Sequence, residues 1–334
     1  MKKEYKCLSC VKTQRSKTED ERMDMDGVPD VGSDAEQRVA IAEFYNRWVS
    51  YIDATPATIA TYRKNIRQFF AYLEERGIER PSREDIVGYR DYLKSRHKPT
   101  TVQGYLVAVK LFFGWMEQEG LYPDVARRIK GAKLDVGHKK DCLTVPQVVR
   151  VLAGIDRSTL RGLRDYAILS VMVTTGLREI SIVRANVGDM RVLGDVVVLY
   201  YQGKGHEERV EYVKLAAPVE VAVRAYLCER GDTQEGSPLF TSLSNKNSGQ
   251  RMTTRSVSRI LKERLVDVGL ESERLTGHSF RHTAATLNLL NGGTVEETQQ
   301  LLGHRNVNTT LIYSHGLERM KNCSEERIAG VIFG

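Results

Sequence analysis

The sequence predicts a mainly α-helical protein with a small β-sheet, arranged as two domains. Apolar residues recur at helical spacing through most of the chain, whereas one short run, Val196 to Tyr201, is rich in β-branched and aromatic residues. A glycine-containing segment without an apolar period, residues 131–143, separates two longer patterned regions. A length of 334 residues allows two domains, and 41% hydrophobic residues are ordinary for a globular protein.

Residues 1–33 are polar, with mixed charge and no apolar period, so we expect a flexible N-terminal tail. Cys7 and Cys10 lie in this tail, but zinc needs about four ligands and neither a second pair nor a histidine follows nearby. We therefore predict no metal site. The chain has five cysteines, an odd number that favours reduced thiols over a disulfide framework.

Residues 34–130 predict a domain of four or five short helices. Pro56 after Thr55, Ser82 after Pro81, and Pro99 are typical helix starts. Two apolar stripes at helical spacing consist of Tyr62, Ile66, Phe69, Phe70 and Leu73, and of Leu106, Val109, Phe112, Phe113 and Met116. The other faces of these helices carry Arg63, Lys64, Arg67, Thr100, Thr101, Gln103 and Lys110. A solvated helical face is the simplest interpretation of each of these residues taken alone.

Residues 131–143 predict a linker, and its basic residues are Lys133, Lys139 and Lys140. Residues 144–316 predict the second domain, in which the segment from Asp165 to Thr175 is apolar on nearly every side, as in a buried helix. The run 196–201 and the alternating residues that follow Gly205 predict a β-hairpin with Lys204 at its tip. Further helices are expected near 217–230, 254–268, 278–290 and 295–302, the last with a capping box of Thr294 and Glu297.

Six residues of the second domain stand in distinctive local contexts. Arg178 ends the segment Thr-Thr-Gly-Leu-Arg, and Lys204 lies between two glycines. His278 and Arg281 belong to His-Ser-Phe-Arg-His, His304 ends Leu-Leu-Gly-His, and Tyr313 follows His304 by nine positions. In this order and spacing, over roughly residues 140 to 320, the chain resembles the tyrosine site-specific recombinases, the phage integrase and Xer family.

The resemblance implies DNA strand exchange without metal or cofactor. Tyr313 would attack a phosphodiester and form a 3′-phosphotyrosyl bond. Arg178 and Arg281 would bind the nonbridging phosphate oxygens, because a guanidinium offers a bidentate fork. Lys204 would protonate the departing 5′ oxygen, His278 would assist proton movement at the phenol, and His304 would donate to a phosphate oxygen.

The family usually has a glutamate three residues after the first arginine, where this chain has Ser181. Glu179 follows Arg178 directly, but successive helix residues point about 100° apart, so Glu179 cannot simply replace the missing carboxylate. Asp189 matches the acidic position that the family shows eleven residues after this arginine.

The resemblance also implies the partners. We expect double-stranded DNA with specific recombination sites, a homo-tetramer on two duplexes, and a role for accessory DNA-bending or excision proteins. The helical domain would contact DNA through the polar residues named above, together with Lys139 and Lys140 of the linker. A formal net charge of +7 fits a polyanionic partner. Neither a membrane span nor a signal peptide is recognisable, so we expect no membrane contact and a cytoplasmic location.

The tail is shorter than a usual arm-type DNA-binding domain, which favours a simple recombinase resembling Xer proteins or mobile-element integrases over the lambda-like type. Integration or excision of a mobile element is the expected role. Dimer resolution of the Xer type, DNA inversion and topoisomerase-like nicking and closing stay open, as does a DNA-binding protein without catalysis. A metalloprotease is disfavoured because Ser279, rather than glutamate, follows His278 in the His278–His282 pair. The apolar end of residues 317–334 predicts docking, either on its own chain or, as in similar recombinases, on a neighbouring protomer.

Overall fold

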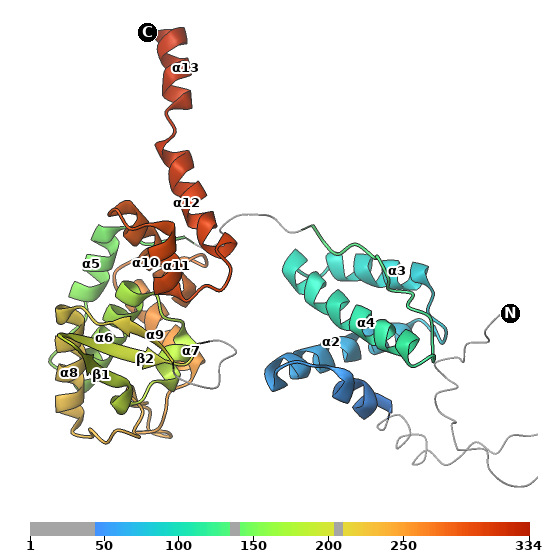
Figure 1. Ribbon diagram of the computed structural model, residues 1–334, viewed down its shortest axis with the longest axis horizontal. Coiled ribbons are helices and arrows are strands. Elements are labelled where there is room, and N and C mark those ends of the chain that lie inside the picture. Colours follow the sequence, from blue (N-terminus) through green and yellow to red (C-terminus); the bar gives the residue numbers. More distant parts are fainter. Residues whose placement is uncertain (1–43, 134–140, 204–209) are drawn as a thin grey trace, which may run out of the picture. The chain divides into compact units, whose positions relative to one another are not determined.

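The computed structural model describes residues 44–133, 141–203 and 210–334, of which residues 315–321 are described by their backbone alone. These residues form two compact units, one before and one after residues 134–140 in the chain (Figure 1). The expected tail, which contains Cys7 and Cys10, lies outside the described residues. The same holds for Lys139, Lys140 and Lys204. The predicted fold class, mainly α-helical with a small sheet, is confirmed.

The first unit is helical, and the predicted helix starts are confirmed. Residues 44–51 form a helix that precedes α2 (Pro56–Glu75), α3 (Arg83–Lys94) and α4 (Pro99–Gln118). Thr55 caps α2 and Ser82 caps α3, while α4 begins with its proline. The core is rich in aromatic side chains, among them Trp48, Phe69, Tyr89, Phe112, Phe113 and Trp115, all nearly or fully buried. The side chain of Asn65 donates a 2.9 Å hydrogen bond to the carbonyl oxygen of Gly104 and thereby ties α2 to α4.

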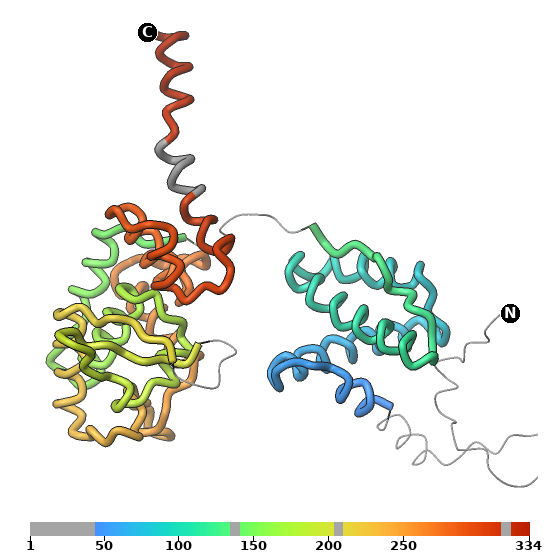
Figure 2. Tube along the Cα trace, in the orientation of Figure 1, coloured from blue at the N-terminus to red at the C-terminus, as the bar shows by residue number. Residues whose placement is uncertain are grey.

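The second unit contains the remaining helices and the sheet, and Figure 2 traces its path. In chain order the helices before the sheet are α5 (Val145–Ala153), α6 (Leu160–Thr175), α7 (Glu179–Arg184) and the short 3-10 helix η2 (Val187–Asp189). The later helices are α8 (Ala217–Arg230), α9 (Thr254–Asp267), α10 (Gly277–Leu290), α11 (Val295–Leu302), α12 (Asn308–Lys321) and α13 (Ser324–Phe333). The capping box of Thr294 and Glu297 is present at the start of α11.

The sheet has three antiparallel strands in the order β1-β2-β3, one more than the predicted hairpin. The hairpin itself is confirmed: β2 (Val196–Tyr201) pairs with β3 (Glu211–Lys214), and Tyr201 lies opposite Glu211 in the last pair before the connection. The strand that the sequence did not reveal is β1 (Met190–Leu193). It is mostly exposed, so it lacks the alternation of buried and exposed residues that marks a half-buried strand.

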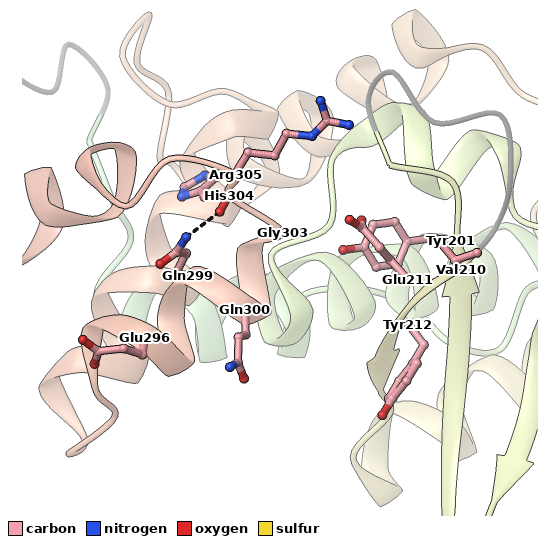
Figure 3. Close-up of a pocket in the computed structure, with 10 residues that line it drawn as sticks. All are labelled: Tyr201, Val210, Glu211, Tyr212, Glu296, Gln299, Gln300, Gly303, His304 and Arg305. Atoms are coloured by element: carbon pink, nitrogen blue, oxygen red, sulfur yellow. Dashed lines mark hydrogen bonds between the residues drawn. The ribbon is translucent and has the colours of Figure 1, made fainter.

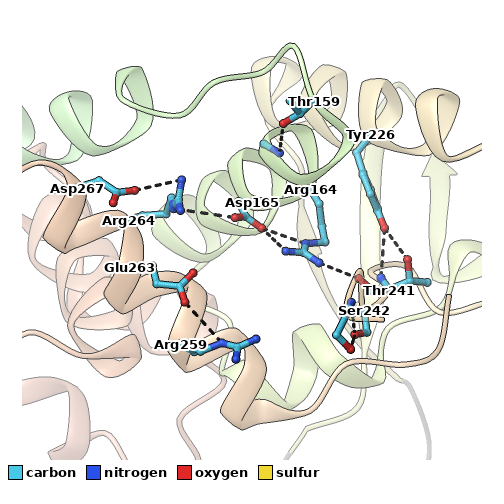
Figure 4. A network of polar contacts seen from close by, with 12 residues as sticks. Thr159, Arg164, Asp165, Tyr226, Thr241, Ser242, Arg259, Glu263, Arg264 and Asp267 are labelled. Atoms are coloured by element: carbon cyan, nitrogen blue, oxygen red, sulfur yellow. Dashed lines mark hydrogen bonds and ion pairs between the residues drawn. The ribbon is translucent and has the colours of Figure 1, made fainter. Parts of the chain in front are cut away.

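Helix α6 is buried along most of its length, as predicted, but it is not purely apolar. Arg164 donates to the carboxylate of Asp165 at 2.7 Å and to the carbonyl oxygen of Thr241 at 3.3 Å (Figure 4). Arg264 of α9 lies 4.0 Å from the other oxygen of Asp165 and 3.1 Å from Asp267. Burial raises the pKa of Asp165 although these arginines oppose the rise. A buried carboxylate needs charged or hydrogen-bonding partners. Because Arg264 of α9 is one partner of Asp165, these contacts hold α9 against α6.

The C-terminal helix α13 has no buried residue, and Val331 and Phe333 are 87% and 85% exposed. The exposed apolar residues of α13 are Ile328, Val331, Ile332 and Phe333. In the described part of the chain this helix therefore buries no apolar face on its own protomer. Among the described residues, no helix combines the length and apolar character that a bilayer crossing requires.

Candidate active site

The candidate site is built where the end of α6, the start of α7 and the helices α10, α11 and α12 meet. Gly176 is the C-cap of α6. It adopts a left-handed conformation with φ of 63° and leaves no room for a side chain, since a Cβ would lie 2.6 Å from Leu302. This close approach brings the end of α6 against the end of α11. Helix α10 contacts α6, α11 and α12 and so lies at the centre of the arrangement.

Arg281 is the buried centre of the site, with only 6% of its surface exposed. Its guanidinium donates to the carbonyl oxygen of Gly176 at 2.6 Å and to that of Leu302 at 2.5 Å. These bonds join α10 to the ends of α6 and α11. Burial and the neighbouring Arg178 lower the pKa of Arg281 to about 10, so the side chain is still a cation at neutral pH. A guanidinium has five N–H groups, and the remaining ones can bind an anion.

Arg178 is half-buried and forms the N-cap position of α7, just after the turn at Gly176. Helix α6 stops at Thr175, so the turn at Gly176 separates this buried helix from Arg178. Its positive charge acts on Arg281, His304, Tyr313 and Tyr201. Two arginines held this close repel each other, and an anion between them would relieve the repulsion.

Tyr313 lies on α12 and is 7% exposed, in a small apolar cluster with Ala285 and Leu302. Burial raises the pKa of its phenol above the usual value, while the charges of Arg281 and Arg178 oppose the rise. The phenol therefore keeps its proton at neutral pH and lies within the electrostatic reach of both arginines. The structure brings together Tyr313, Arg178 and Arg281 in one protomer.

His304 follows α11 and is half-buried. Its Nδ1 lies 2.9 Å from the hydroxyl of Thr310, a fully buried residue of α12. Burial, together with the charges of Arg281 and Arg178, lowers the pKa of His304 to about 4. The imidazole is thus neutral at pH 7. When Nδ1 accepts a hydrogen bond from the Thr310 hydroxyl, the single N–H of the neutral ring is at Nε2. This N–H can donate a hydrogen bond to a phosphate oxygen.

The two histidines of the His-Ser-Phe-Arg-His segment lie in different surroundings. His278 is exposed in the first turn of α10, one turn before Arg281. His282 is half-buried, and its ring centroid lies 5.3 Å from that of Tyr313. Sequence reasoning considered His282 only as a metal ligand. Within the described residues, no group of three or more His, Cys, Asp or Glu side chains could hold a metal ion.

Tyr201, at the end of β2, is a further member of the cluster that the sequence did not indicate. Its hydroxyl bonds to Glu211, and burial together with this carboxylate raises its pKa to about 12 while Arg281 and Arg178 act against the rise. Figure 3 shows Tyr201 and Glu211 on one side of an open pocket, with Gly303 and His304 on the other. Strands β2 and β3, which lie before and after Lys204 in the chain, therefore border the loop that contains Gly303 and His304.

Glu179, Ser181 and Asp189, the residues that the sequence singled out after Arg178, all contact other residues of the second unit. Glu179 accepts a 2.8 Å hydrogen bond from Ser258 of α9. Ser181, at the position where the family usually has glutamate, is buried and donates a 3.4 Å bond to the carbonyl oxygen of Gln202. The buried carboxylate of Asp189 accepts a 2.7 Å bond from the backbone of Asn186.

The predicted DNA contacts of the first unit do not all share one surface. Arg63, Lys64 and Arg67 form a stripe on α2, and Lys64 lines a shallow pocket with Thr101 of α4. Thr100 is exposed beside Thr101. Gln103 packs against Gly131, where an added Cβ would lie 1.7 Å from its oxygen. Lys110 is nine residues beyond Thr101 and faces the opposite side of α4.

The structure adds a basic stripe on α9 that sequence reasoning missed. Arg255, Arg259 and Lys262 are exposed at positions i, i+4 and i+7 and line one depression together with Arg161. The spacing of these three residues, opposite the buried Val257 and Ile260, is the signal that could have revealed it.

Comparison with known proteins identifies the family. Residues 142–319 match the phage integrase family, and residues 43–120 match the phage integrase N-terminal SAM-like domain. The chain is 31% identical over 270 residues to tyrosine recombinase XerC of Herpetosiphon aurantiacus, which covers 78% of this chain and 85% of that protein.

Solved structures share the fold. The XerH site-specific recombinase bound to palindromic difH substrate, in a post-cleavage complex, aligns with a TM-score of 0.67 and 19% identity over 90% of this chain and 84% of that chain. A lambda integrase tetramer bound to a Holliday junction aligns with a TM-score of 0.62 and 15% identity over 82% and 76% of the two chains. Fold and family matches together define the class, and the chain belongs to the phage integrase family. Within that family it is a tyrosine recombinase.

Proposed function

We propose that this protein is a site-specific DNA recombinase that cuts and rejoins strands through Tyr313. One observation carries the proposal: a buried phenol lies within the electrostatic reach of two arginines that repel each other, and the same two arginines act on the neutral His304. A tetrahedral phosphate fits this arrangement because its oxygens can accept N–H groups from both arginines. Similar proteins are recombinases by name, and a structural neighbour is a recombinase bound to DNA.

In the proposed cleavage step, the Tyr313 oxygen bonds to phosphorus and the bond from phosphorus to the 5′ oxygen breaks. Lys204 supplies the proton for that oxygen, and Arg178 and Arg281 neutralise the charge that builds on the nonbridging oxygens. His304 donates a further hydrogen bond to the phosphate. Attack by a 5′ hydroxyl reverses the step and rejoins the DNA, so neither a nucleotide nor a metal enters the scheme.

A base must accept the phenol proton, because a phenol is protonated at neutral pH and burial raises the pKa of Tyr313 further. His278 is exposed at the start of α10, where bound DNA can reach it. His282 contacts the phenol ring in the protein without DNA. We assign His278 the proton transfer and His282 the support of the phenol ring, and comparing single substitutions of the two histidines tests the assignment.

DNA binding is proposed to use both units. The stripe of Arg63, Lys64 and Arg67 on α2, with Thr100 and Thr101 of α4, provides a basic and polar surface. The α9 stripe of Arg255, Arg259 and Lys262 provides a second one in the unit that holds the site. Lys139 and Lys140 would contact the backbone from the linker.

The working assembly is proposed to be a tetramer on two duplexes, in the cytoplasm with its DNA, with accessory DNA-bending or excision proteins where the sites require them. Support for the tetramer comes from the lambda integrase neighbour, which is a tetramer on a Holliday junction. The apolar face of α13 is unburied on its own chain and would dock on the next protomer. Deletion of residues 324–334 should leave a folded monomer that binds one site but no longer assembles cooperatively.

Mapping cleavage on DNA that flanks the gene tests the function and its role. Recombination requires two matched sites and yields exchanged products, whereas topoisomerase-like activity relaxes supercoils with one site or none. Integration and excision of a mobile element, the role we favour, would place the sites at the ends of that element. Dimer resolution would place them at a single chromosomal locus.

A further inference from the structure

We infer that Glu179 is a positioning residue that fixes the start of α10, and with it His278 and Arg281, relative to Arg178. The inference rests on the proposed function, because the reaction serves as its readout. Glu179 is the first residue of α7 and directly follows Arg178 in the chain. A shift of the backbone at Glu179 therefore also moves the neighbouring arginine.

The carboxylate of Glu179 joins three helices. Its Oε1 accepts a 2.8 Å hydrogen bond from Ser258 of α9. The same oxygen lies 1.9 Å from the point where a Cβ on Gly277 would be, so the carboxylate packs directly on the first residue of α10. Leu261 of α9 borders the same space, 3.1 Å from that point. Only glycine at position 277 leaves room for this contact.

Electrostatics favour the same arrangement. The start of a helix carries a partial positive charge, and a nearby carboxylate stabilises it. The first turn of α10 has no acidic residue of its own. Glu179 brings a negative charge to this end of α10 from another helix, while Ser258 holds the carboxylate in place.

The consequence concerns the geometry of the site. His278 and Arg281 lie in the first turn and a half of α10, and Arg178 precedes Glu179. Groups that act on one phosphate must stay aligned, and a displacement of about 1 Å can lower a rate about 100-fold. The contact between Glu179 and Gly277 fixes this alignment before DNA binds.

The test is a double-mutant cycle on single-turnover covalent cleavage, measured at saturating concentrations of a nicked duplex that carries the mapped site. Glu179→Ala and Gly277→Ala should each slow cleavage by about tenfold or more, with the DNA concentration for half-saturation changed less than about twofold. In the double variant the added Cβ no longer meets a carboxylate. Its rate should therefore lie within about twofold of Glu179→Ala, instead of showing the product of the two losses.

Conservative and control variants complete the design. Glu179→Gln keeps the volume and the acceptor for Ser258, and should cleave within about threefold of the parent. Gly114→Ala, in a helix where an added Cβ meets nothing within 4 Å, and Glu229→Ala, at an exposed position on α8, should have no effect. Thermal unfolding checks that each variant is folded at the assay temperature.

The outcomes separate the inference from the proposed function. A parent protein that forms no covalent complex on its own site contradicts the proposed function. A parent that cleaves normally while Glu179→Ala or Gly277→Ala cleaves equally fast contradicts the inference alone. Losses that multiply in the double variant, or a Glu179→Gln variant as slow as Glu179→Ala, also overturn it.

Discussion

The guanidinium of Arg281 donates a 2.6 Å hydrogen bond to the carbonyl oxygen of Gly176, which lies 105 residues earlier in the chain. The same side chain also donates to Leu302, so one residue joins α10 to the ends of two other helices. Arg281 thus combines two tasks, because it holds the site together and presents its remaining N–H groups to an anion.

Substitution of Arg281 by lysine should therefore impair both stability and cleavage. An ammonium cannot reproduce the planar fork, so the carbonyl oxygens lose partners and the free energy of unfolding should fall by about 2 kcal/mol. Single-turnover cleavage should slow by at least about 100-fold. Arg178→Lys is the matched control, since Arg178 is half-buried and should lose cleavage with a smaller loss of stability. Equal losses of stability in the two variants would contradict the structural role of Arg281.

His304 should make the stability of the protein depend on pH. The pKa of His304 is lowered from 6.5 to about 4 in the folded protein, so the unfolded chain binds a proton first as the pH falls. The stability that the neutral side chain contributes is present above pH 6.5 and is lost as the pH falls to about 4. The melting-temperature difference between the parent and His304→Gln should shrink over this range. A difference independent of pH would contradict the lowered pKa.

Gly303 should tolerate no side chain, because an added Cβ would meet Tyr201. Gly231 serves as the matched control position. Gly303 and Gly231 both end helices with positive φ, of 59° and 77°. An added Cβ meets the Tyr201 hydroxyl at 2.8 Å at Gly303, but nothing within 4 Å at Gly231. Gly231→Ala should cost about 1 kcal/mol of unfolding free energy for the backbone alone, and Gly303→Ala about 2 kcal/mol more. Denaturant titration measures both, and equal costs would contradict the packing of Tyr201 against the His304 loop.

The α9 stripe should contribute to DNA affinity through phosphate contacts. Arg259 and Arg224 are both exposed and both pair with a glutamate four residues away, so they form a matched set. Arg259→Ala should weaken DNA binding and reduce the slope of log K against log salt by about one, whereas Arg224→Ala should change neither. Fluorescence anisotropy at several salt concentrations measures both quantities. The same slope in both variants would remove α9 from the proposed DNA surface.

Local signals in the sequence predicted the parts of the fold that depend on neighbouring residues. Thr55, Ser82 and Thr294 precede the helices that they cap, and the run 196–201 forms the strand that it predicts. These features arise from hydrogen bonds and periodicity within a few residues. Strand β1 escaped notice because its exposed residues carry no such periodicity.

Contacts between segments far apart in the chain could not be predicted from such local patterns. The set of Arg178, Arg281, His304 and Tyr313 was selected by its resemblance to a family, and the structure brings these residues together. The bonds of Arg281 to two carbonyl oxygens, the contact of Glu179 with Gly277 and the approach of Tyr201 to Gly303 depend on tertiary packing alone. Helical spacing alone places His278 and His282 on one face of α10. Only the structure shows that His278 is exposed whereas His282 is half-buried.

Covalent capture on a nicked suicide duplex tests the central claim most directly. Tyr313→Phe removes only the hydroxyl of the proposed nucleophile, and Tyr201→Phe removes the hydroxyl of the other buried phenol on which Arg281 and Arg178 act. The account predicts that the parent and Tyr201→Phe form a protein–DNA adduct that survives denaturing electrophoresis, and that Tyr313→Phe forms none. An adduct of equal yield with Tyr313→Phe would contradict the account.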